Sequence, residues 1–261
     1  MVAALLTLST LTVLSIISYV QERAANDLEA SLTIKQLWSA DQTEREAAKT
    51  ALIRLGQRAI PPLIALLNEI RSDPRPRYVP GREHDAAEAE ARYRTLLNAG
   101  KTEESHAALN ELMNLRINWR LKSDVCELLG RIRAEEAIPA LIDAMISVES
   151  FNAWETMSPQ MQALIAIGAP GVPKLIDAIE TAGLRAGAIN FGDDPIFTEE
   201  ARRRLARIQI FRTQARSCMV LGEIGDATAL PVLEKLLAET DDQILSRYIK
   251  DAIVRVRVRS N

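Results

Sequence analysis

The chain has 261 residues, of which 48% are hydrophobic, 26% are charged and only 4% are aromatic. The apolar share is large enough for a core and excludes a fully disordered chain, while the scarcity of aromatic residues favours helices over a β-sandwich or barrel. A net charge of −3 gives no overall basic field for nucleic-acid binding. We therefore expect an all-α protein.

The N-terminal segment, residues 2–20, contains no charged residue. Its length is close to the roughly 20 residues that span a bilayer as a helix. We interpret residues 1–22 as a single-pass membrane anchor. Two alternatives stay open: a signal sequence, whose cleavage would release a secreted or periplasmic protein, and a buried first helix of the fold. The flanks show almost no Lys/Arg asymmetry, so the side of the membrane that holds the rest of the chain stays open.

Residues 23–71 predict a linker helix, over residues 25–39, and then the first copy of a repeat. The repeat motif is an apolar residue, Pro, any residue and Leu, followed by apolar residues at helical spacing. Pro suits the first turn of a helix, so each copy should open a helix with the Leu on its buried face. The four copies are Ile60-Pro61-Pro62-Leu63, Ile138-Pro139-Ala140-Leu141, Val172-Pro173-Lys174-Leu175 and Leu230-Pro231-Val232-Leu233.

A glycine precedes each copy of the motif and follows an apolar residue, a pattern that predicts the end of an earlier helix. These glycines are Gly56, Gly130, Gly168 and Gly222. Four residues before them lie Leu52, Cys126, Leu164 and Cys218. The equivalence predicts that both cysteines are small core residues rather than a disulfide pair or zinc ligands. Each unit is then a helix, a glycine turn and a second helix opened by Pro, and neighbouring units must stack to bury their apolar stripes.

Two inserts separate the copies. Residues 72–118 predict a Pro-rich loop and an antiparallel helical pair, over residues 85–98 and 103–115, around Gly100. Residues 182–197, with three glycines and a proline, predict a loop before a long helix that starts at Thr198. The last helix of the segment 119–261, which holds the second to fourth copies, should begin near Asp241 and Asp242.

The run over residues 220–233 resembles a HEAT-like repeat of the short type named after the phycobilisome lyases, and residues 47–56 and 129–132 resemble it more loosely. The resemblance covers roughly residues 40–70 and 120–260. It implies an α-solenoid of HEAT-like helical hairpins, with the helical pair described above as an insertion. Such repeats usually form a protein-binding surface, and they are shared by proteins of many functions.

Residues that would carry catalysis are scarce. The chain has two histidines, His84 and His106, and neither belongs to a recognisable triad or metal-ligand spacing. His84 lies among acidic residues that we interpret as a solvated helix start. The HEAT-like enzyme deoxyhypusine hydroxylase takes its iron ligands from His-Glu pairs, and this chain has no His-Glu dipeptide. We therefore predict no enzymatic activity, no metal and no cofactor.

The leading hypothesis is a non-catalytic, membrane-tethered scaffold that binds another protein through its concave surface. Asp143, Asp177 and Lys235 each lie four residues after the Pro of their copy, and we expect them to face that surface.

Two alternatives concern other ligands. The first is a bilin lyase-like or other small-molecule activity in the solenoid groove. The second is nucleic-acid binding through the Arg-rich helix 199–216, where Arg203 and Arg207 share one flank and are candidate contacts for an anionic ligand. Arg212 and Arg216 share the other flank, and we interpret the whole set as a solvated, ion-paired face. Three further arginines near the C-terminus should favour the negative end of the helix dipole, with anionic lipid as an alternative contact: Arg255, Arg257 and Arg259.

Overall fold

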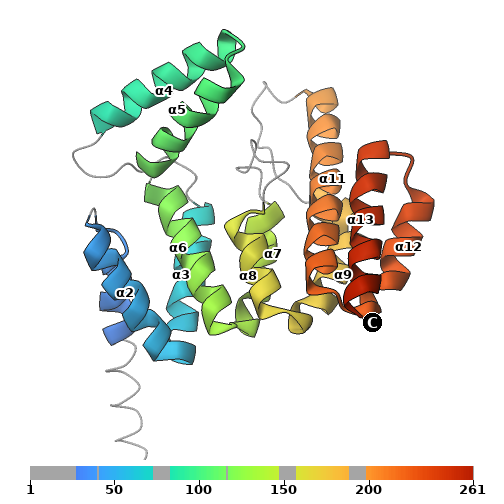
Figure 1. Cartoon of the computed structure of the whole chain (residues 1–261), viewed down its shortest axis with the longest axis horizontal. Coiled ribbons are helices and arrows are strands. Elements are labelled where there is room, and N and C mark those ends of the chain that lie inside the picture. Colours follow the sequence, from blue (N-terminus) through green and yellow to red (C-terminus); the bar gives the residue numbers. More distant parts are fainter. Residues whose placement is uncertain are drawn as a thin grey trace, which may run out of the picture. The chain divides into compact units, whose positions relative to one another are not determined.

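The computed structural model describes residues 28–39, 41–72, 83–115, 117–146, 157–187 and 198–260. The regular structure in these residues is entirely helical, without a strand, which confirms the all-α class (Figure 1). The chain divides into two compact units, Met1–Ala65 with Tyr78–Ile117 and Leu66–Arg77 with Asn118–Asn261, so helix α3 contributes to both.

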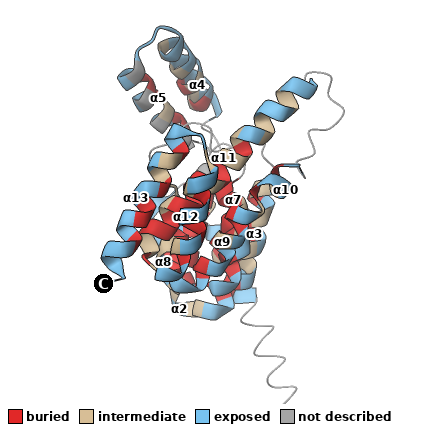
Figure 2. Ribbon diagram, turned by 90° about the vertical axis from the view of Figure 1, so that its right-hand side faces the viewer, coloured by how far each residue is buried: buried red, intermediate tan, exposed pale blue. Residues whose placement is uncertain are grey.

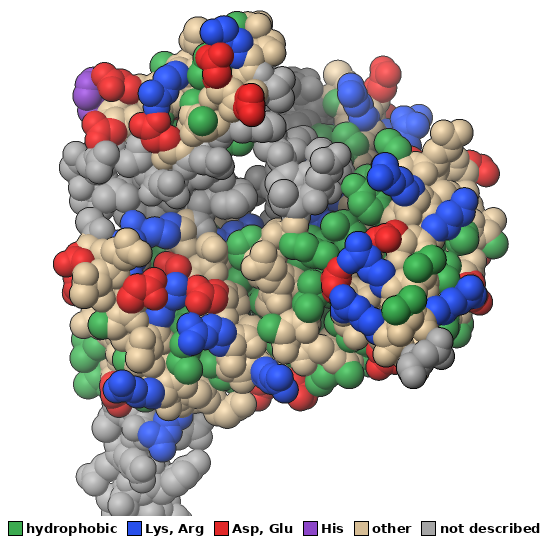
Figure 3. All heavy atoms as spheres, in the orientation of Figure 1, with side chains coloured by type: hydrophobic (Ala, Val, Ile, Leu, Met, Phe, Trp, Pro, Cys, Tyr) green, Lys and Arg blue, Asp and Glu red, His purple; other side chains and the backbone are tan. Residues whose placement is uncertain are grey.

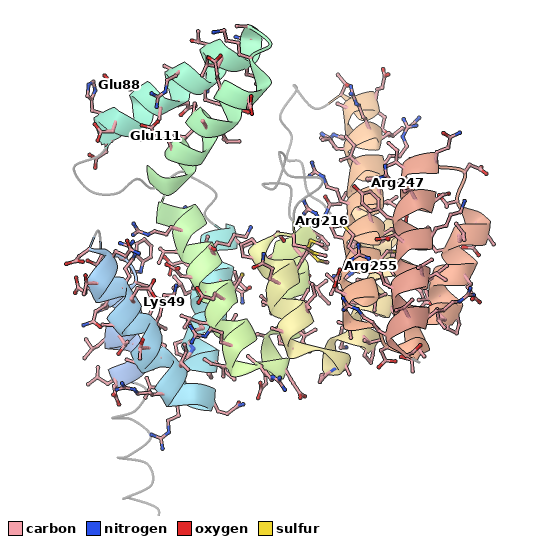
Figure 4. The ribbon with its side chains drawn as sticks, in the orientation of Figure 1. Lys49, Glu88, Glu111, Arg216, Arg247 and Arg255 are labelled. Atoms are coloured by element: carbon pink, nitrogen blue, oxygen red, sulfur yellow. The ribbon has the colours of Figure 1, made fainter. Side chains whose placement is uncertain are left out.

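The first unit contains a helical segment over residues 28–36, α2 (Gln42–Leu55), the first half of α3 (Ile60–Ser72), α4 (Glu83–Asn98) and α5 (Thr102–Leu115). Helices α4 and α5 pack on each other and reverse direction at Gly100, whose φ of +71° suits glycine. Arg92 of α4 pairs with Glu111 of α5 (Figure 4). The predicted helical pair is thus confirmed, and its buried apolar cluster is small: Ala86, Ala89 and Leu112.

The described residues of the second unit continue through these helices: α6 (Ile117–Ile132), α7 (Ile138–Ile146), α8 (Pro159–Ile167), α9 (Val172–Glu180), α10 (Ala182–Gly187), α11 (Glu199–Ile224), α12 (Leu230–Glu239) and α13 (Gln243–Arg259). Helix α11 is central in this unit because it packs against α7, α8, α9, α10 and α13. Thr198 caps α11 by accepting a hydrogen bond from the Ala201 amide at 3.2 Å, and Asp242 caps α13 in the same way. Both predicted helix starts are confirmed.

The four copies of the motif share one local structure. A short 3₁₀ turn follows the first helix of each pair, and the proline is the second residue of the helix that comes next. Figure 2 shows buried residues concentrated on the inner faces of α7, α8, α9 and α11. The motif leucines are all fully buried, as predicted: Leu63, Leu141, Leu175 and Leu233.

The glycines that precede the motif have two different roles. Gly56 and Gly168 end their helices with φ of +55° and +83°, as predicted. The same prediction is wrong for Gly130 and Gly222, which lie inside α6 and α11. These helices end later, at Ile132 and Ile224, and the residues that follow them, Arg133 and Gly225, take positive φ.

Gly130 lies where α6 meets α8, and Gly222 lies where α11 meets α13. An ideal Cβ at Gly130 would be 2.9 Å from Ala163 Cα in α8, and one at Gly222 would be 2.9 Å from Ala252 Cα in α13. Both distances are shorter than carbon atoms in contact tolerate. The two glycines are therefore needed for helix packing, because any side chain would separate the helices.

Cys126 and Cys218 are fully buried and form no disulfide, as predicted. Burial raises the pKa of each thiol from 9.0 to about 12, against small opposing effects of Lys122 at Cys126 and of a backbone hydrogen bond at Cys218. The thiolate is the reactive form of cysteine. Both side chains are therefore unreactive for two reasons: burial keeps the reagent away, and the raised pKa keeps the thiol protonated.

We expect a maleimide at pH 8 to leave both cysteines of the folded chain unlabelled and to label both after unfolding in urea, as measured by intact mass. The raised pKa also makes stability pH-dependent. The folded state holds the thiol protons more tightly, so this contribution is complete below pH 9 and is lost as the pH rises towards 12. Rapid labelling of either cysteine without denaturant would contradict the buried assignment.

Several predictions made from the sequence lie partly or wholly outside the described residues. They are the proposed anchor, residues 1–22, the first three residues of the linker helix predicted over 25–39, most of the Pro-rich loop that opens the insert 72–118, and residues 188–197 of the second predicted loop. Within the described ranges, no single helix has the length and apolar character to cross a bilayer. Among the described residues, only the pair Pro159–Ile167 and Ala169–Glu180 passes this test together, across a bend of 110°.

Candidate functional site

Four charged side chains from four helices of the second unit form a continuous ion-pair network. Asp143 of α7 accepts from Arg71 of α3 at 2.9 Å and from Arg185 of α10 at 3.1 Å. Arg185 also pairs with Asp177 of α9 at 3.4 Å and donates to the Thr181 hydroxyl at 3.1 Å. We call Arg71, Asp143, Asp177 and Arg185 the second-helix network, because three of them lie on helices that the repeat motif opens.

The second-helix network contains two of the three residues predicted to contact a protein partner. Asp143 and Asp177 occupy equivalent repeat positions and are joined through Arg185. Lys235, at the same position of the fourth copy, is exposed on α12, and no ion pair to it is found in the described part of the chain. The structure therefore brings two of the three residues together, and their contact with a partner stays a prediction.

Arg185 was missed because residues 182–197 were predicted to be a loop. Residues 182–187 instead form α10, so that prediction is wrong for the part of the insert that the structure describes. The glycines at 183 and 187 weaken helix propensity. However, Ala182 and Ala186, four residues apart, are both buried and hold α10 in place. That i, i+4 alanine pair was the available signal for the helix.

The second-helix network leaves its side chains between 31% and 55% exposed. It therefore ties successive helices together while keeping its carboxylates within reach of solvent. A surface that carries charges of both signs, as this network does, suits a protein partner with polar and charged groups of its own.

Arg185→Gln should cost less than about 1 kcal/mol of unfolding free energy, because its ion pairs are partly solvated. The loss should shrink further in about 1 M salt, where the Debye length is about 3 Å. Urea unfolding measures the loss of unfolding free energy at low salt and at high salt. The matched control is Arg207→Gln, because Arg207 is an exposed arginine of α11. A large, salt-independent loss would mean that the network is a core element instead.

The arginines of α11 divide into an exposed set and a buried set. Arg203 pairs with Glu199 at 3.1 Å, with both side chains more than 70% exposed, and Arg207 is exposed as well. This flank matches the predicted solvated face. Arg212 and Arg216 are buried, with 1% and 7% exposure, so for them the prediction of a solvated face is wrong.

The buried arginines belong to a polar stripe at spacing i, i+3, i+4, i+7 and i+8 on α11: Gln209, Arg212, Thr213, Arg216 and Ser217. Arg216 extends from α11 towards α7 and donates to the Met145 carbonyl (Figure 4). Gln209 donates to the Ile146 carbonyl. These carbonyls end α7 and have no partner within that helix, so the stripe caps α7 from a neighbouring helix.

The electrostatics of the stripe follow from its burial. Burial, and to a smaller extent the charge of Arg212, lowers the pKa of Arg216 from 12.5 to about 10. Burial also lowers the pKa of Arg212. Arg216 is still protonated at neutral pH, where its charge is favourable at the negative end of the α7 dipole. Its contacts are those of a structural residue.

The C-terminal arginines of α13 form ion pairs with α11 and α12. Arg259 donates to a Glu223 carboxylate oxygen at 2.6 Å and also to the Glu223 carbonyl near the end of α11. Arg255 pairs with Glu223 as well, and Arg257 pairs with Glu234 of α12 at 2.7 Å. Arg257 and Arg259 lie in the last turn of α13, as predicted, and Arg259 also contacts a carbonyl near the negative end of α11.

Candidate sites for chemistry are few in the described residues. No group of three or more His, Cys, Asp and Glu in these ranges could hold a metal ion. His84 is exposed and 3.2 Å from Glu88, as expected for a solvated helix start. A shallow depression of about 500 Å³ beside α2 is lined by residues of that helix alone: Thr43, Glu46, Ala47, Thr50, Ala51 and Arg54.

Comparison with protein-family models, with curated proteins and with solved structures finds no match to this chain.

Proposed function

We propose that this chain is a non-catalytic scaffold, an α-solenoid of HEAT-like helical pairs that binds another protein through the surface formed by its second helices. The observation that carries the proposal is the second-helix network, in which equivalent positions of successive pairs, Asp143 and Asp177, meet through Arg185. A row of equivalent side chains on stacked helices is the arrangement by which repeat proteins present an extended surface.

The packing of the pairs supports the mechanism. Close contact at Gly130 and Gly222 and a seam of fully buried leucines hold the helices in fixed positions. A surface that is already ordered binds without the entropic cost of ordering it at the moment of binding. The scaffold therefore acts by presenting an ordered surface of the second unit to its partner.

The two alternatives have less support. A small-molecule activity requires a deep pocket with several convergent polar groups, and the depression beside α2 is open and one-sided. Nucleic-acid binding requires a row of available arginines. Of the six on α11, Arg212 and Arg216 are buried and Arg203 is paired with Glu199.

Protein capture tests the scaffold proposal. The full chain, tagged and solubilised in mild detergent, is compared with Asp177→Lys, Lys235→Glu and the control Glu136→Lys, which changes an exposed residue of a turn. We expect a defined set of proteins with the unmodified chain and the control, and its loss with one or both of the other variants. Urea unfolding verifies that all four chains are folded. Equal capture by all of them would contradict the proposed surface.

The membrane tether has a separate test. We propose that residues 2–20 anchor the chain as a helix. After alkaline carbonate extraction, the full chain should remain in the membrane pellet. Release into the supernatant would contradict the anchor and favour either a cleaved signal sequence or a buried first helix.

A further inference from the structure

The last helix of the second unit has an exposed face with a regular pattern. Its residues follow one another at steps of three and four: Ile244, Arg247, Asp251, Val254 and Val258. Ile244, Val254 and Val258 are 62%, 59% and 71% exposed, whereas Ile and Val side chains are more often buried. At about 100° per residue, this face lies opposite the buried face of α13, formed by Leu245, Ile249, Ala252, Ile253 and Val256. We call these five exposed residues the outer face of α13.

The spacing of the outer face is that of a coiled-coil seam. Residues three and four apart in alternation form the a and d positions of a heptad, which face a partner helix when two helices pack side by side. Here Ile244, Asp251 and Val258 occupy a, and Arg247 and Val254 occupy d. Figure 3 shows apolar, basic and acidic side chains intermixed on the surface over α12 and α13.

We propose that the outer face of α13 binds the same face of a second copy of this chain, with the two helices antiparallel. In an antiparallel pair, a positions meet d positions of the partner helix. Ile244 then lies opposite Val254 of the second copy, and Arg247 lies opposite Asp251 of the second copy. Two-fold symmetry makes each contact twice, so two apolar layers flank two ion-pair layers.

The charge pattern selects this orientation over the parallel one. In a parallel pair, each residue would face its own counterpart, so Arg247 would meet Arg247 and Asp251 would meet Asp251. Like charges in direct opposition are unfavourable. The antiparallel register replaces both repulsions with ion pairs. Within one copy, Asp251 pairs with Arg255 at 2.9 Å, but its side chain remains 57% exposed, and a carboxylate accepts several hydrogen bonds.

The small area of the outer face of α13 limits the affinity of the proposed dimer. Two heptads of one helix bury less than the roughly 800 Å² per partner that is typical of a stable complex. The dimer is therefore weak and concentration-dependent. Its charged central layers fix the register and orientation, while the apolar layers supply most of the burial.

A charge exchange tests the contact. Arg247→Glu places two acids opposite each other in both central layers, and Asp251→Lys places two bases opposite each other. Each variant alone should dimerise at least about tenfold more weakly than the unmodified chain, by sedimentation equilibrium of the full chain in mild detergent. An equimolar mixture of the two restores complementary charges in both layers and should regain the association. No dimer of the unmodified chain, or equal association of all samples, overturns the proposal.

Disulfide formation tests the orientation independently. Ile244→Cys mixed with Val254→Cys should cross-link under mild oxidation, whereas neither variant should cross-link by itself. Cys126 and Cys218 do not interfere, because both are buried. Cross-linking of Ile244→Cys with itself would indicate a parallel pair and would overturn the register.

Discussion

Leu175→Ala should lower the free energy of unfolding by about 2–5 kcal/mol, which is the usual cost of replacing a buried leucine by alanine. Leu175 is fully buried on the second helix of its pair and follows the motif proline by two residues. The substitution removes its contacts in the seam and leaves a cavity that surrounding helices fill only in part. The equivalent residues Leu141 and Leu233, also fully buried, should show losses of the same size.

The matched control is Leu184→Ala, because Leu184 is 78% exposed on α10. Its effect should stay within about 0.5 kcal/mol. Urea unfolding of the full chain, followed by far-ultraviolet circular dichroism, gives both values. Since repeat arrays can unfold in more than one step, the midpoint of each transition is compared between variants. Equal midpoints for Leu175→Ala and Leu184→Ala would contradict the buried seam.

Gly222→Ala should destabilise the chain by about 1–3 kcal/mol, the cost of overpacking a tight contact. The sign of this change in unfolding free energy distinguishes a tight helix contact from an ordinary helical glycine. Inside a helix, replacing glycine by alanine normally gains about 1 kcal/mol of helix propensity. At Gly222, however, the new Cβ would lie 2.9 Å from Ala252 Cα, and backbone cannot move aside as a flexible side chain can. Gly130→Ala should behave alike, because its Cβ would lie 2.9 Å from Ala163 Cα.

Gly183→Ala is the control for this effect. Gly183 also lies inside a helix, α10, but a Cβ there would meet no heavy atom within 4 Å. This variant should be neutral or more stable by about 0.5–1 kcal/mol. Thermal unfolding measures the change in midpoint temperature of each of the three variants against the unmodified chain. The midpoint should fall for Gly222→Ala and Gly130→Ala and should stay the same or rise for Gly183→Ala. If Gly222→Ala and Gly183→Ala both raise the midpoint, the close approach of α11 and α13 is wrong.

The features that the sequence predicted well are local. A proline in the first turn of a helix and a leucine two residues later act through backbone geometry and helical spacing. The four copies were therefore recognisable without the rest of the fold. The same reasoning placed Cys126 and Cys218 in the core, because they occupy the position held by leucine in the other two copies.

The features that the sequence did not predict depend on contacts between helices. Gly130 and Gly222 look like Gly56 and Gly168 in sequence, but packing against Ala163 and Ala252, not helix termination, explains them. No spacing rule distinguishes these two uses of glycine.

The burial of the arginines of α11 also depends on contacts between helices and could not be predicted from their spacing. Burial of Arg216 is tolerated because the end of α7 provides a carbonyl acceptor. For a related reason, the sequence predicted only part of the second-helix network. Asp143 and Asp177 follow from repeat position, whereas Arg185 depends on α10, which its glycines obscured.

Hydrogen exchange of the full chain, measured by mass spectrometry, tests the central claim that the repeat pairs share one buried seam. The second half of α11 is packed between neighbouring helices and is buried along most of residues 209–222. In contrast, the hairpin of α4 and α5 has the small cluster of Ala86, Ala89 and Leu112. Because local stability follows buried contacts, amides of α11 over residues 212–222 should exchange among the slowest in the chain and those of α4 much faster. Exchange of the α11 amides at the rate of the α4 amides would contradict the account.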